Sequence, residues 1–187
     1  MERIQSIAVY LGATMPKNAA YVDAVRELGT QLAKRGITLV FGGSREGTMT
    51  VLADAVLQNG GKAVGVFTKR LPMSLLYQGL TETIITEDLS ERKAKMLSLA
   101  DAVIALPGSF GTWDELFDVI ENAKIDMING MEPKPIGILN LDGFYDGLAE
   151  LVKRSIDEGF TARKYERLLA FSEDVGGLLD ILLPENN

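Results

Sequence analysis

The chain has 187 residues, of which 47% are hydrophobic and 24% are charged, and this is the composition of an ordinary globular domain. It contains neither cysteine nor histidine, which excludes disulfides, thiol chemistry, Ser-His-Asp triads and the usual zinc sites. The net charge of −7 disfavours a broad contact with phosphate backbones, so we expect no nucleic-acid partner.

Apolar segments rich in β-branched residues alternate with segments of helical periodicity. The expected strands cover residues 7–11, 37–41, 63–67, 83–86, 102–106, 135–141 and 168–171. The expected helices cover residues 21–35, 47–58, 89–99, 112–124, 144–157 and 175–183, and residues 70–81 suit a loop over a site. Buried strands separated by helices indicate βαβ units. We therefore expect residues 1–187 to form a single Rossmann-like α/β domain, doubly wound, with a mainly parallel sheet of about six or seven strands and helices on both faces.

Nothing in the sequence indicates a membrane protein. No segment approaches the roughly 20 consecutive apolar residues of a membrane span. The stretch Met1–Gln5 lacks the basic and apolar regions of a secretory signal. We therefore expect a cytoplasmic protein with no membrane partner.

Ligands of such sheets bind beyond the carboxyl ends of the strands, where the next helix presents free N–H groups. The first segment expected at that edge is Gly42-Gly43-Ser44-Arg45-Glu46-Gly47-Thr48, whose glycines let the backbone approach an anion. It lacks the Lys-Ser/Thr of a P-loop and does not match G-x-G-x-x-G, so dinucleotide binding is not supported. A contact with phosphate or ribose and a plain tight turn both remain open.

The second segment at this edge is Pro107-Gly108-Ser109-Phe110-Gly111-Thr112-Trp113-Asp114-Glu115, where a strand again passes through a glycine turn into a helix. Thr112 and Glu115 have the spacing of a capping box, in which Thr caps the helix and Glu returns to the N–H of the cap. Glu115 is equally able to point into the ligand crevice. Near the helix dipole we expect its carboxylate to stay ionised.

The third segment places Arg92 and Lys93 in the first turn of the helix expected over residues 89–99. The helix dipole disfavours cations at that end, so an anionic ligand or a partner carboxylate would explain them. A solvated basic face with a Glu91–Lys95 pair is the alternative.

Chain topology predicts that the second and third segments meet. The helix that carries Arg92 runs away from the ligand edge, and strand 102–106 returns to it. Arg92 and Glu115 can therefore approach each other although they are 23 positions apart in the sequence. A carboxylate and a guanidinium beside two glycine turns indicate a nucleotide site.

Five motifs, in order and over nearly the whole chain, resemble those of the LOG ("lonely guy") family. The similar segments are Gly42-Gly43-Ser44-Arg45-Glu46-Gly47-Thr48-Met49 (GGGxxGxM in the family), Ser90-Glu91-Arg92-Lys93-Ala94 (RKA), Pro107 to Glu115 (PGGxGTxxE), Leu139-Asn140-Leu141-Asp142-Gly143-Phe144-Tyr145 (LNxDGYY) and Glu158-Gly159-Phe160 (EGF). Members of this family are cytokinin riboside 5′-monophosphate phosphoribohydrolases, often mislabelled lysine decarboxylases.

The resemblance implies hydrolysis of the N-glycosidic bond of a nucleoside 5′-monophosphate, AMP or a cytokinin nucleotide, to free base and ribose 5-phosphate. It implies Arg92 and Glu115 as the catalytic pair, no metal or organic cofactor, a small-molecule nucleotide as partner, and a homodimer. Further contacts to the substrate are expected from Gly43, Gly47, Thr48, Lys93, Gly108, Ser109, Phe110, Gly111, Thr112 and Asp114. Since no imidazole is present, the acid limb of any activity should follow a carboxylate such as Glu115.

Several positions depart from the family pattern. Ser44 and Ser109 replace glycines of the two turns, Ser90 stands where a histidine commonly precedes RKA, and Glu121-Asn122-Ala123-Lys124 replaces a stretch containing WAQ. These departures concern substrate identity and rate more than the fold. A non-catalytic nucleotide sensor or carrier on the same scaffold is therefore the alternative function. A pyridoxal phosphate decarboxylase has no support, because no lysine can be singled out as its Schiff base.

Overall fold

The computed structural model of the protein describes residues 4–183, so most of the stretch Met1–Gln5 lies outside the described residues. Within this range the strands are β1 (Ser6–Tyr10), β2 (Thr38–Phe41), β3 (Ala63–Thr68), β4 (Glu82–Thr86), β5 (Ala102–Ala105), β6 (Ile136–Leu139) and β7 (Leu169–Ser172). The α-helices are α1 (Ala19–Lys34), α2 (Gly47–Gln58), α3 (Leu89–Leu99), α4 (Phe110–Ile128), α5 (Asp146–Asp157) and α6 (Val175–Leu182). Short 3₁₀ helices are η1 (Met73–Leu75), η2 (Leu141–Gly143) and η3 (Arg163–Leu168).

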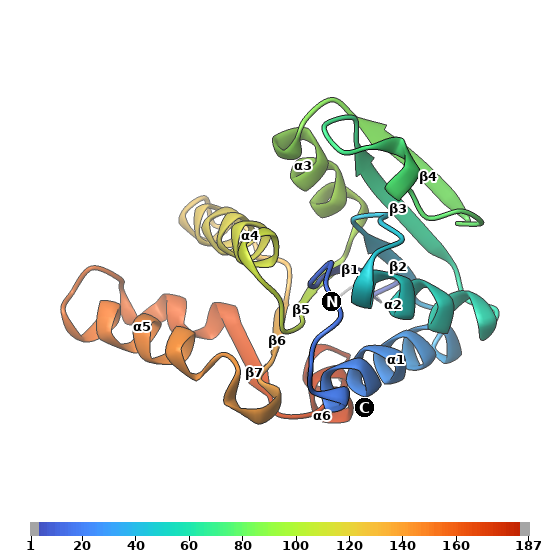
Figure 1. Ribbon diagram of the computed structural model, residues 1–187. Coiled ribbons are helices and arrows are strands. Elements are labelled where there is room, and N and C mark those ends of the chain that lie inside the picture. The colour runs from blue at the N-terminus through green and yellow to red at the C-terminus, as the bar shows by residue number, and fades with distance from the viewer. Residues whose placement is uncertain (1–3, 184–187) are drawn as a thin grey trace.

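The strands form one parallel sheet in the order β4-β3-β2-β1-β5-β6-β7 (Figure 1). Strand β1 is central, and Ile7 pairs with Leu39 of β2 on one side and with Ala102 of β5 on the other. The chain extends the sheet in one direction through β4 and then in the other from β5. The expected doubly wound, parallel sheet is confirmed, and its switch point lies between β1 and β5.

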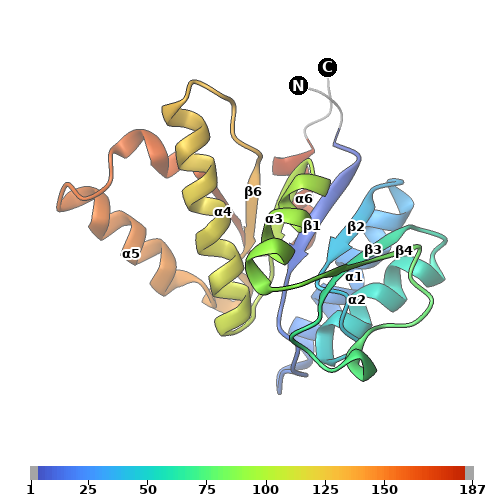
Figure 2. The same ribbon diagram turned by 90° about the horizontal axis from the view of Figure 1, so that it is seen from above.

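Helices cover both faces of the sheet, as the views in Figures 1 and 2 show. Helices α1, α2 and α6 pack on a core that includes Ile7 and Val9. Helices α3 and α4 pack on the opposite core, which includes Ala8 and Tyr10. Successive residues of β1 thus serve opposite faces, as the two-residue period of a strand requires. No helix within residues 4–183 is long and apolar enough to cross a membrane.

Helix α4 differs most from its expected bounds. It begins at Phe110 and ends at Ile128, whereas the sequence pattern predicted residues 112–124. Its end is set by Asn129 and by Gly130, which has a φ of +74°. Glycine in this left-handed conformation is the usual residue after a helix. Gly130 was therefore the signal for the end of α4, and the predicted end at residue 124 came too early.

Residues 70–81, predicted as a loop over a site, are held in place by backbone hydrogen bonds to a neighbouring turn. The segment contains η1, and Ser44 forms an antiparallel bridge with Leu76. Backbone bonds continue this contact, since Arg45 N–H donates to the Leu75 carbonyl at 2.8 Å and Tyr77 N–H donates to the Gly43 carbonyl at 2.9 Å. The segment is therefore attached to the turn between β2 and α2.

Candidate active site

The turn between β2 and α2 lies against two neighbouring segments. Gly43 has a φ of +70°, and a Cβ at this position would lie 3.2 Å from the Cα of Gly65 in β3. Gly47 has a φ of +50°, and a Cβ there would overlap the carbonyl of Ala13. Only glycine combines these backbone angles with such close approaches. The glycines at positions 43 and 47 therefore determine the shape of this turn and let its backbone pack against neighbouring segments.

Gly12, two residues after the end of β1, joins the two glycine turns. The buried Thr48 hydroxyl donates to the Gly12 carbonyl at 2.5 Å, which commits this hydroxyl to the fold. From the other turn, Gly108 packs so closely that a Cβ on it would lie 3.0 Å from the Gly12 nitrogen. Sequence reasoning missed Gly12, although a glycine directly after a buried strand was the available signal.

The turn between β5 and α4 starts the helix earlier than the capping-box interpretation requires. Ser109 is the N-cap residue, and its side chain makes no capping hydrogen bond. Thr112 is therefore inside the first turn, and a box formed by Thr112 and Glu115 is wrong. Because α4 begins three residues before that box would start it, Glu115 lies beyond the first turn and its side chain reaches across to α3.

The first turn of α4 presents several unpaired donors. The N–H groups of Phe110, Gly111 and Thr112 precede the first residues that have a partner four positions back, and the dipole makes this end positive. The Thr112 hydroxyl is buried and has no hydrogen-bond partner among the described residues. Phe110 is 81% exposed on the outer side of the turn. Donors of this kind suit an anion such as a phosphate.

Helix α3 begins with a cap that uses Glu91. The Asp88 carboxylate accepts from the Glu91 N–H at 2.8 Å, and the Glu91 carboxylate accepts from the Glu87 N–H at 2.7 Å. Glu91 thus satisfies the N-terminus of the helix, as first-turn carboxylates do. The alternative of a Glu91–Lys95 pair on a solvated face is therefore wrong.

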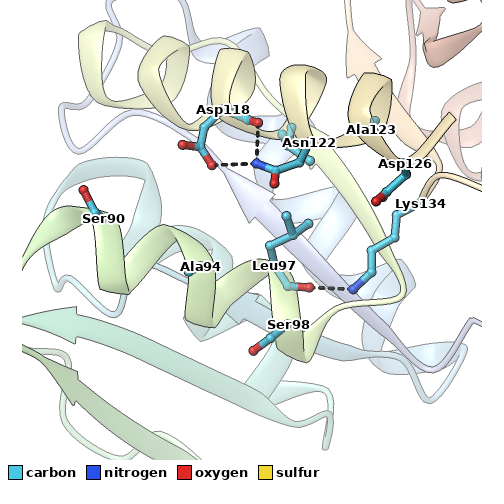
Figure 3. Close-up of a pocket in the computed structure, with 10 residues that line it drawn as sticks. Ser90, Ala94, Leu97, Ser98, Asp118, Asn122, Ala123, Asp126 and Lys134 are labelled. Atoms are coloured by element: carbon cyan, nitrogen blue, oxygen red, sulfur yellow. Dashed lines mark hydrogen bonds between the residues drawn. The ribbon is translucent and has the colours of Figure 1, made fainter. Parts of the chain in front are cut away.

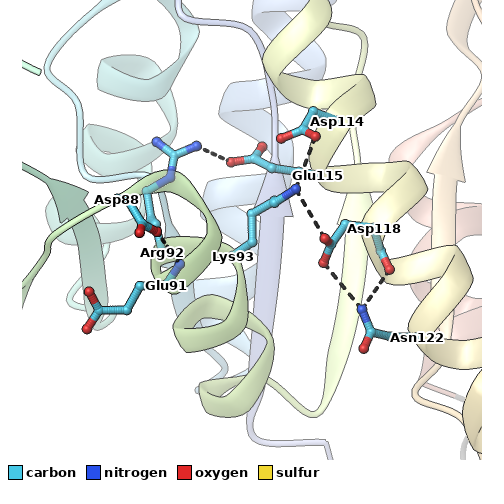
Figure 4. A network of polar contacts seen from close by, with 8 residues as sticks. All are labelled: Asp88, Glu91, Arg92, Lys93, Asp114, Glu115, Asp118 and Asn122. Carbon is cyan, nitrogen blue, oxygen red and sulfur yellow. Dashed lines mark hydrogen bonds and ion pairs between the residues drawn. The ribbon is translucent and has the colours of Figure 1, made fainter. Parts of the chain in front are cut away.

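Arg92 and Glu115 form an ion pair between α3 and α4 (Figure 4). Arg92 Nη2 donates to Glu115 Oε1 at 2.5 Å, and the side chains are 11% and 4% exposed. Arg92 Nε is buried without a partner among the described residues. A Cβ at Gly42 would lie 3.4 Å from Arg92 Nη1, so the guanidinium also borders the β2–α2 turn. Arg92 and Glu115 thus approach each other in the structure, as the chain topology predicted.

Lys93 binds carboxylates of α4 beside this pair. Its Nζ lies 3.0 Å from Asp114 Oδ1 and 3.1 Å from Asp118 Oδ1, and Asn122 donates to Asp118 (Figure 4). Burial lowers the pKa of Lys93, but the hydrogen bonds to the two carboxylates outweigh it and raise the pKa above its usual value. Lys93 is therefore a charged link between α3 and α4. Sequence reasoning did not single out Asp118.

The Glu115 carboxyl is perturbed by its position. Burial raises its pKa from 4.5 to about 7, outweighing the lowering by Arg92 and Lys93. Removal from water thus opposes the ionisation that the helix dipole was expected to favour. Burial also raises the pKa of Tyr10 far above its usual value, with Glu115 and Asp118 adding to the rise. Tyr10 was expected only as a core residue, and its phenol stays neutral.

A cleft of about 500 Å³ lies between α3 and α4 (Figure 3). Its lining residues are Ser90, Ala94, Leu97, Ser98, Asp118, Val119, Asn122, Ala123, Asp126 and Lys134. The cleft adjoins the ion-pair network through Asp118, but Arg92 and Glu115 do not line it. Three residues from the departures from the family pattern, Ser90, Asn122 and Ala123, form part of its wall. Within residues 4–183 no group of three or more carboxylates is arranged to hold a metal ion.

Comparison with known proteins agrees with this geometry. A family model described as "Possible lysine decarboxylase" matches residues 49–182. The Arabidopsis thaliana protein named cytokinin riboside 5′-monophosphate phosphoribohydrolase LOG2 is 36% identical over 96% of this chain and 83% of its own length. The chain belongs to the LOG family. The Oryza sativa subsp. japonica protein named cytokinin riboside 5′-monophosphate phosphoribohydrolase LOG is 40% identical over 89% of this chain and 68% of its own.

Solved structures share the fold of this LOG-family chain at lower identity. The molybdenum cofactor binding protein from Rippkaea orientalis has a TM-score of 0.68 and 18% identity over 97% of both chains. The Moco carrier protein from Chlamydomonas reinhardtii has a TM-score of 0.67 and 21% identity over 96% of both chains. Likeness at these identities shows the fold alone, and it agrees with the Rossmann-like architecture.

All of the expected site residues of this LOG-family chain lie at the carboxyl edge of the sheet, in three groups. Gly43, Gly47 and Thr48 belong to the β2–α2 turn, Gly108, Ser109, Phe110, Gly111 and Thr112 to the β5–α4 turn, and Arg92, Lys93, Asp114 and Glu115 to the ion-pair network. Gly47 and Thr48 contact the segment after β1, and Lys93 and Asp114 contact each other. These contacts shape the site, and they leave the first turn of α4 with the unpaired donors.

Proposed function

We propose that the protein hydrolyses the N-glycosidic bond of a nucleoside 5′-monophosphate, AMP or a cytokinin nucleotide, to the free base and ribose 5-phosphate. The names of relatives that match most of the chain support this activity. The observation that carries it is the buried Arg92–Glu115 pair beside the two glycine turns. A carboxylate and a guanidinium at this place match what the reaction needs.

The phosphate is the part of the substrate that the turns are suited to hold. The free N–H groups at the start of α4 and the unpartnered Thr112 hydroxyl are donors without a competing acceptor. Gly108 and Ser109 belong to the same turn, and Thr48 of the β2–α2 turn is bonded to Gly12, against which Gly108 packs. The proposed phosphate site therefore lies between the turns, at the switch point of the sheet.

The chemistry is proposed to centre on Glu115. Breaking an N-glycosidic bond builds positive charge on the ribose ring, which an ionised carboxylate stabilises. The same carboxylate is placed to align or activate the attacking water. Arg92, whose Nη2 holds Glu115, orients the carboxylate or binds phosphate or ribose oxygens with its remaining N–H groups. In this proposal the Glu115 carboxylate and the Arg92 guanidinium are the two groups that promote the reaction.

We propose a homodimer as the working form. Helix α4 carries the exposed apolar side chains Phe117, Ile125 and Ile128, and the neighbouring α5 carries the exposed Leu151. Figures 1 and 2 show α5 beside α4 at the β7 end of the sheet. Exposed apolar side chains on neighbouring helices support an interface between two copies of the chain. We also propose a cytoplasmic location. A chain without cysteine forms no disulfide and therefore needs no oxidising compartment.

The test measures base release. The protein is incubated with AMP and with isopentenyladenosine monophosphate, and free base is followed by chromatography. We expect release by the wild type and a loss of about 100-fold or more in Glu115→Gln. Glu27→Gln is the matched control, because Glu27 is an exposed carboxyl of α1, which covers the opposite face of the sheet from Glu115.

Two results would contradict the proposal. Release by Glu115→Gln at the wild-type rate removes Glu115 from the chemistry. Binding of nucleotides in calorimetry with no turnover over a panel of monophosphates replaces the enzyme by the non-catalytic sensor or carrier.

A further inference from the structure

The turn between β6 and α5 is held in one conformation by side-chain hydrogen bonds. Asn140 Oδ1 accepts from the Tyr145 N–H at 2.6 Å, and Asn140 Nδ2 donates to Asp146 Oδ1 at 2.8 Å. Asp142 and Gly143 have φ values of +53° and +70°. A left-handed conformation is unfavourable for a residue with a Cβ, so the bonds of Asn140 maintain a backbone path that is costly by itself. The proposed reaction assigns no role to this turn.

The turn directs Tyr145 into the interior. Tyr145 is 4% exposed, belongs to the core between the sheet and α4, and packs edge-on against Phe144 with ring centres 5.0 Å apart. Its hydroxyl donates to the Leu106 carbonyl at 2.8 Å, across 39 positions of the sequence. Among residues 4–183 no backbone N–H donates to that carbonyl, so Tyr145 satisfies it.

Leu106 is the residue that connects β5 to the turn proposed to bind the phosphate. Its N–H donates to the Tyr10 carbonyl at 2.9 Å, which continues the contact with β1. The pairing of β5 with β6 ends one residue earlier, at Ala105 and Ile138. The Tyr145 hydroxyl therefore bonds to the backbone one residue beyond the end of the β5–β6 pairing, directly before Pro107 turns the chain.

We propose that Tyr145 is a positioning residue for the substrate phosphate, an inference that rests on the proposed function. Its hydroxyl fixes the Leu106 carbonyl, and this sets where the following turn presents its N–H groups and the Thr112 hydroxyl. Tyr145 lies behind the turn and touches no substrate. Its removal therefore acts on the affinity for phosphate-bearing ligands and leaves the chemistry of the ion pair in place.

The variant Tyr145→Phe removes the hydroxyl and keeps the ring. We expect the Kd of ribose 5-phosphate, measured by calorimetry, and the KM for AMP to rise about tenfold, since a buried carbonyl that loses its donor shifts or rehydrates. The kcat at saturating AMP should change less than about threefold, because the ion pair is untouched. A merely structural role would lower the active fraction without moving Kd.

Tyr165→Phe is the matched control. Tyr165 is half-buried against the same core, and its hydroxyl makes no side-chain hydrogen bond recorded within residues 4–183. Asn140→Ala is the second variant, which loosens the turn without removing the buried hydroxyl. It should raise Kd in the same direction, and it decides the matter if Tyr145→Phe does not fold.

The outcomes separate this inference from the proposed function. An unchanged Kd in folded Tyr145→Phe, or in Asn140→Ala when the first variant is unfolded, overturns the role of Tyr145. A wild type that binds ribose 5-phosphate and releases no base refutes the hydrolase, and the Kd comparison still decides the role of Tyr145. A wild type that releases base from AMP without measurable binding of ribose 5-phosphate leaves the hydrolase standing, and an unchanged KM for AMP in Tyr145→Phe then overturns the role of Tyr145.

Discussion

The buried Glu115 carboxyl should make the stability of the protein depend on pH in an unusual direction. Its folded pKa is about 7, against an ordinary value of 4.5, so the folded state binds this proton more tightly than the unfolded state. The stabilisation is fully present below the unfolded pKa and is lost as the pH rises through the folded pKa. The rise from 4.5 to about 7 corresponds to a loss of about 3 kcal/mol of unfolding free energy through this one group.

The variant Glu115→Gln isolates this contribution, because glutamine has a similar shape and does not titrate. Unfolding free energies are measured with urea between about pH 4 and pH 8 for both proteins. We expect the advantage of the wild type over the variant to shrink by about 3 kcal/mol across this range. Glu27→Gln, which changes an exposed carboxyl of α1, should follow the wild type throughout.

Parallel stability curves for the wild type and Glu115→Gln would refute the reasoning. They would mean that Arg92 and Lys93 compensate the burial of the carboxylate completely. The ion pair would then remain charged at every pH of the experiment, and burial would have no measurable effect on this group.

Two further predictions concern rate and packing. The kcat at saturating AMP should fall about tenfold per pH unit below about pH 7, because protonated Glu115 no longer stabilises positive charge. A kcat that does not change with pH, or the same fall at low pH in Glu115→Gln, contradicts this prediction. Gly47→Ala should lower the unfolding free energy by more than about 2 kcal/mol in urea unfolding, because its Cβ would overlap the Ala13 carbonyl at a positive φ. Gly147→Ala is its control, with open space around the added Cβ and ordinary helix geometry, and should be neutral or stabilising; equal effects would exclude the steric explanation.

Much of the fold was predictable because the buried strands are continuous apolar segments in the sequence. β5 is buried along its whole length, and the expected strand over residues 102–106 contains it. The bounds of α4 were harder, because Thr112 and Glu115 imitate a helix start within a helix that had already begun at Phe110. Local spacing cannot distinguish these cases, since the choice of N-cap depends on where β5 delivers the chain.

The residues of the candidate site were predictable from the sequence, but the protonation of Glu115 was not. That Arg92 approaches Glu115 follows from the order of strands and helices alone. The pKa of Glu115 does not, since it depends on water being excluded by packing from both helices. The contact of Gly108 with Gly12 and the bond of Tyr145 to Leu106 join segments far apart in the sequence, and no short motif contains both partners.

The position of β1 in the sheet has a consequence for synthesis on the ribosome. The strands made first, β1 to β4, occupy one side of the sheet in consecutive order, so this half can assemble as the chain emerges. Arg92 belongs to α3, which follows β4, and Glu115 belongs to α4, which is made after β5, the strand that pairs with the other edge of β1. The nascent half thus carries an exposed guanidinium and an open strand edge, and joining the second half closes both in one event.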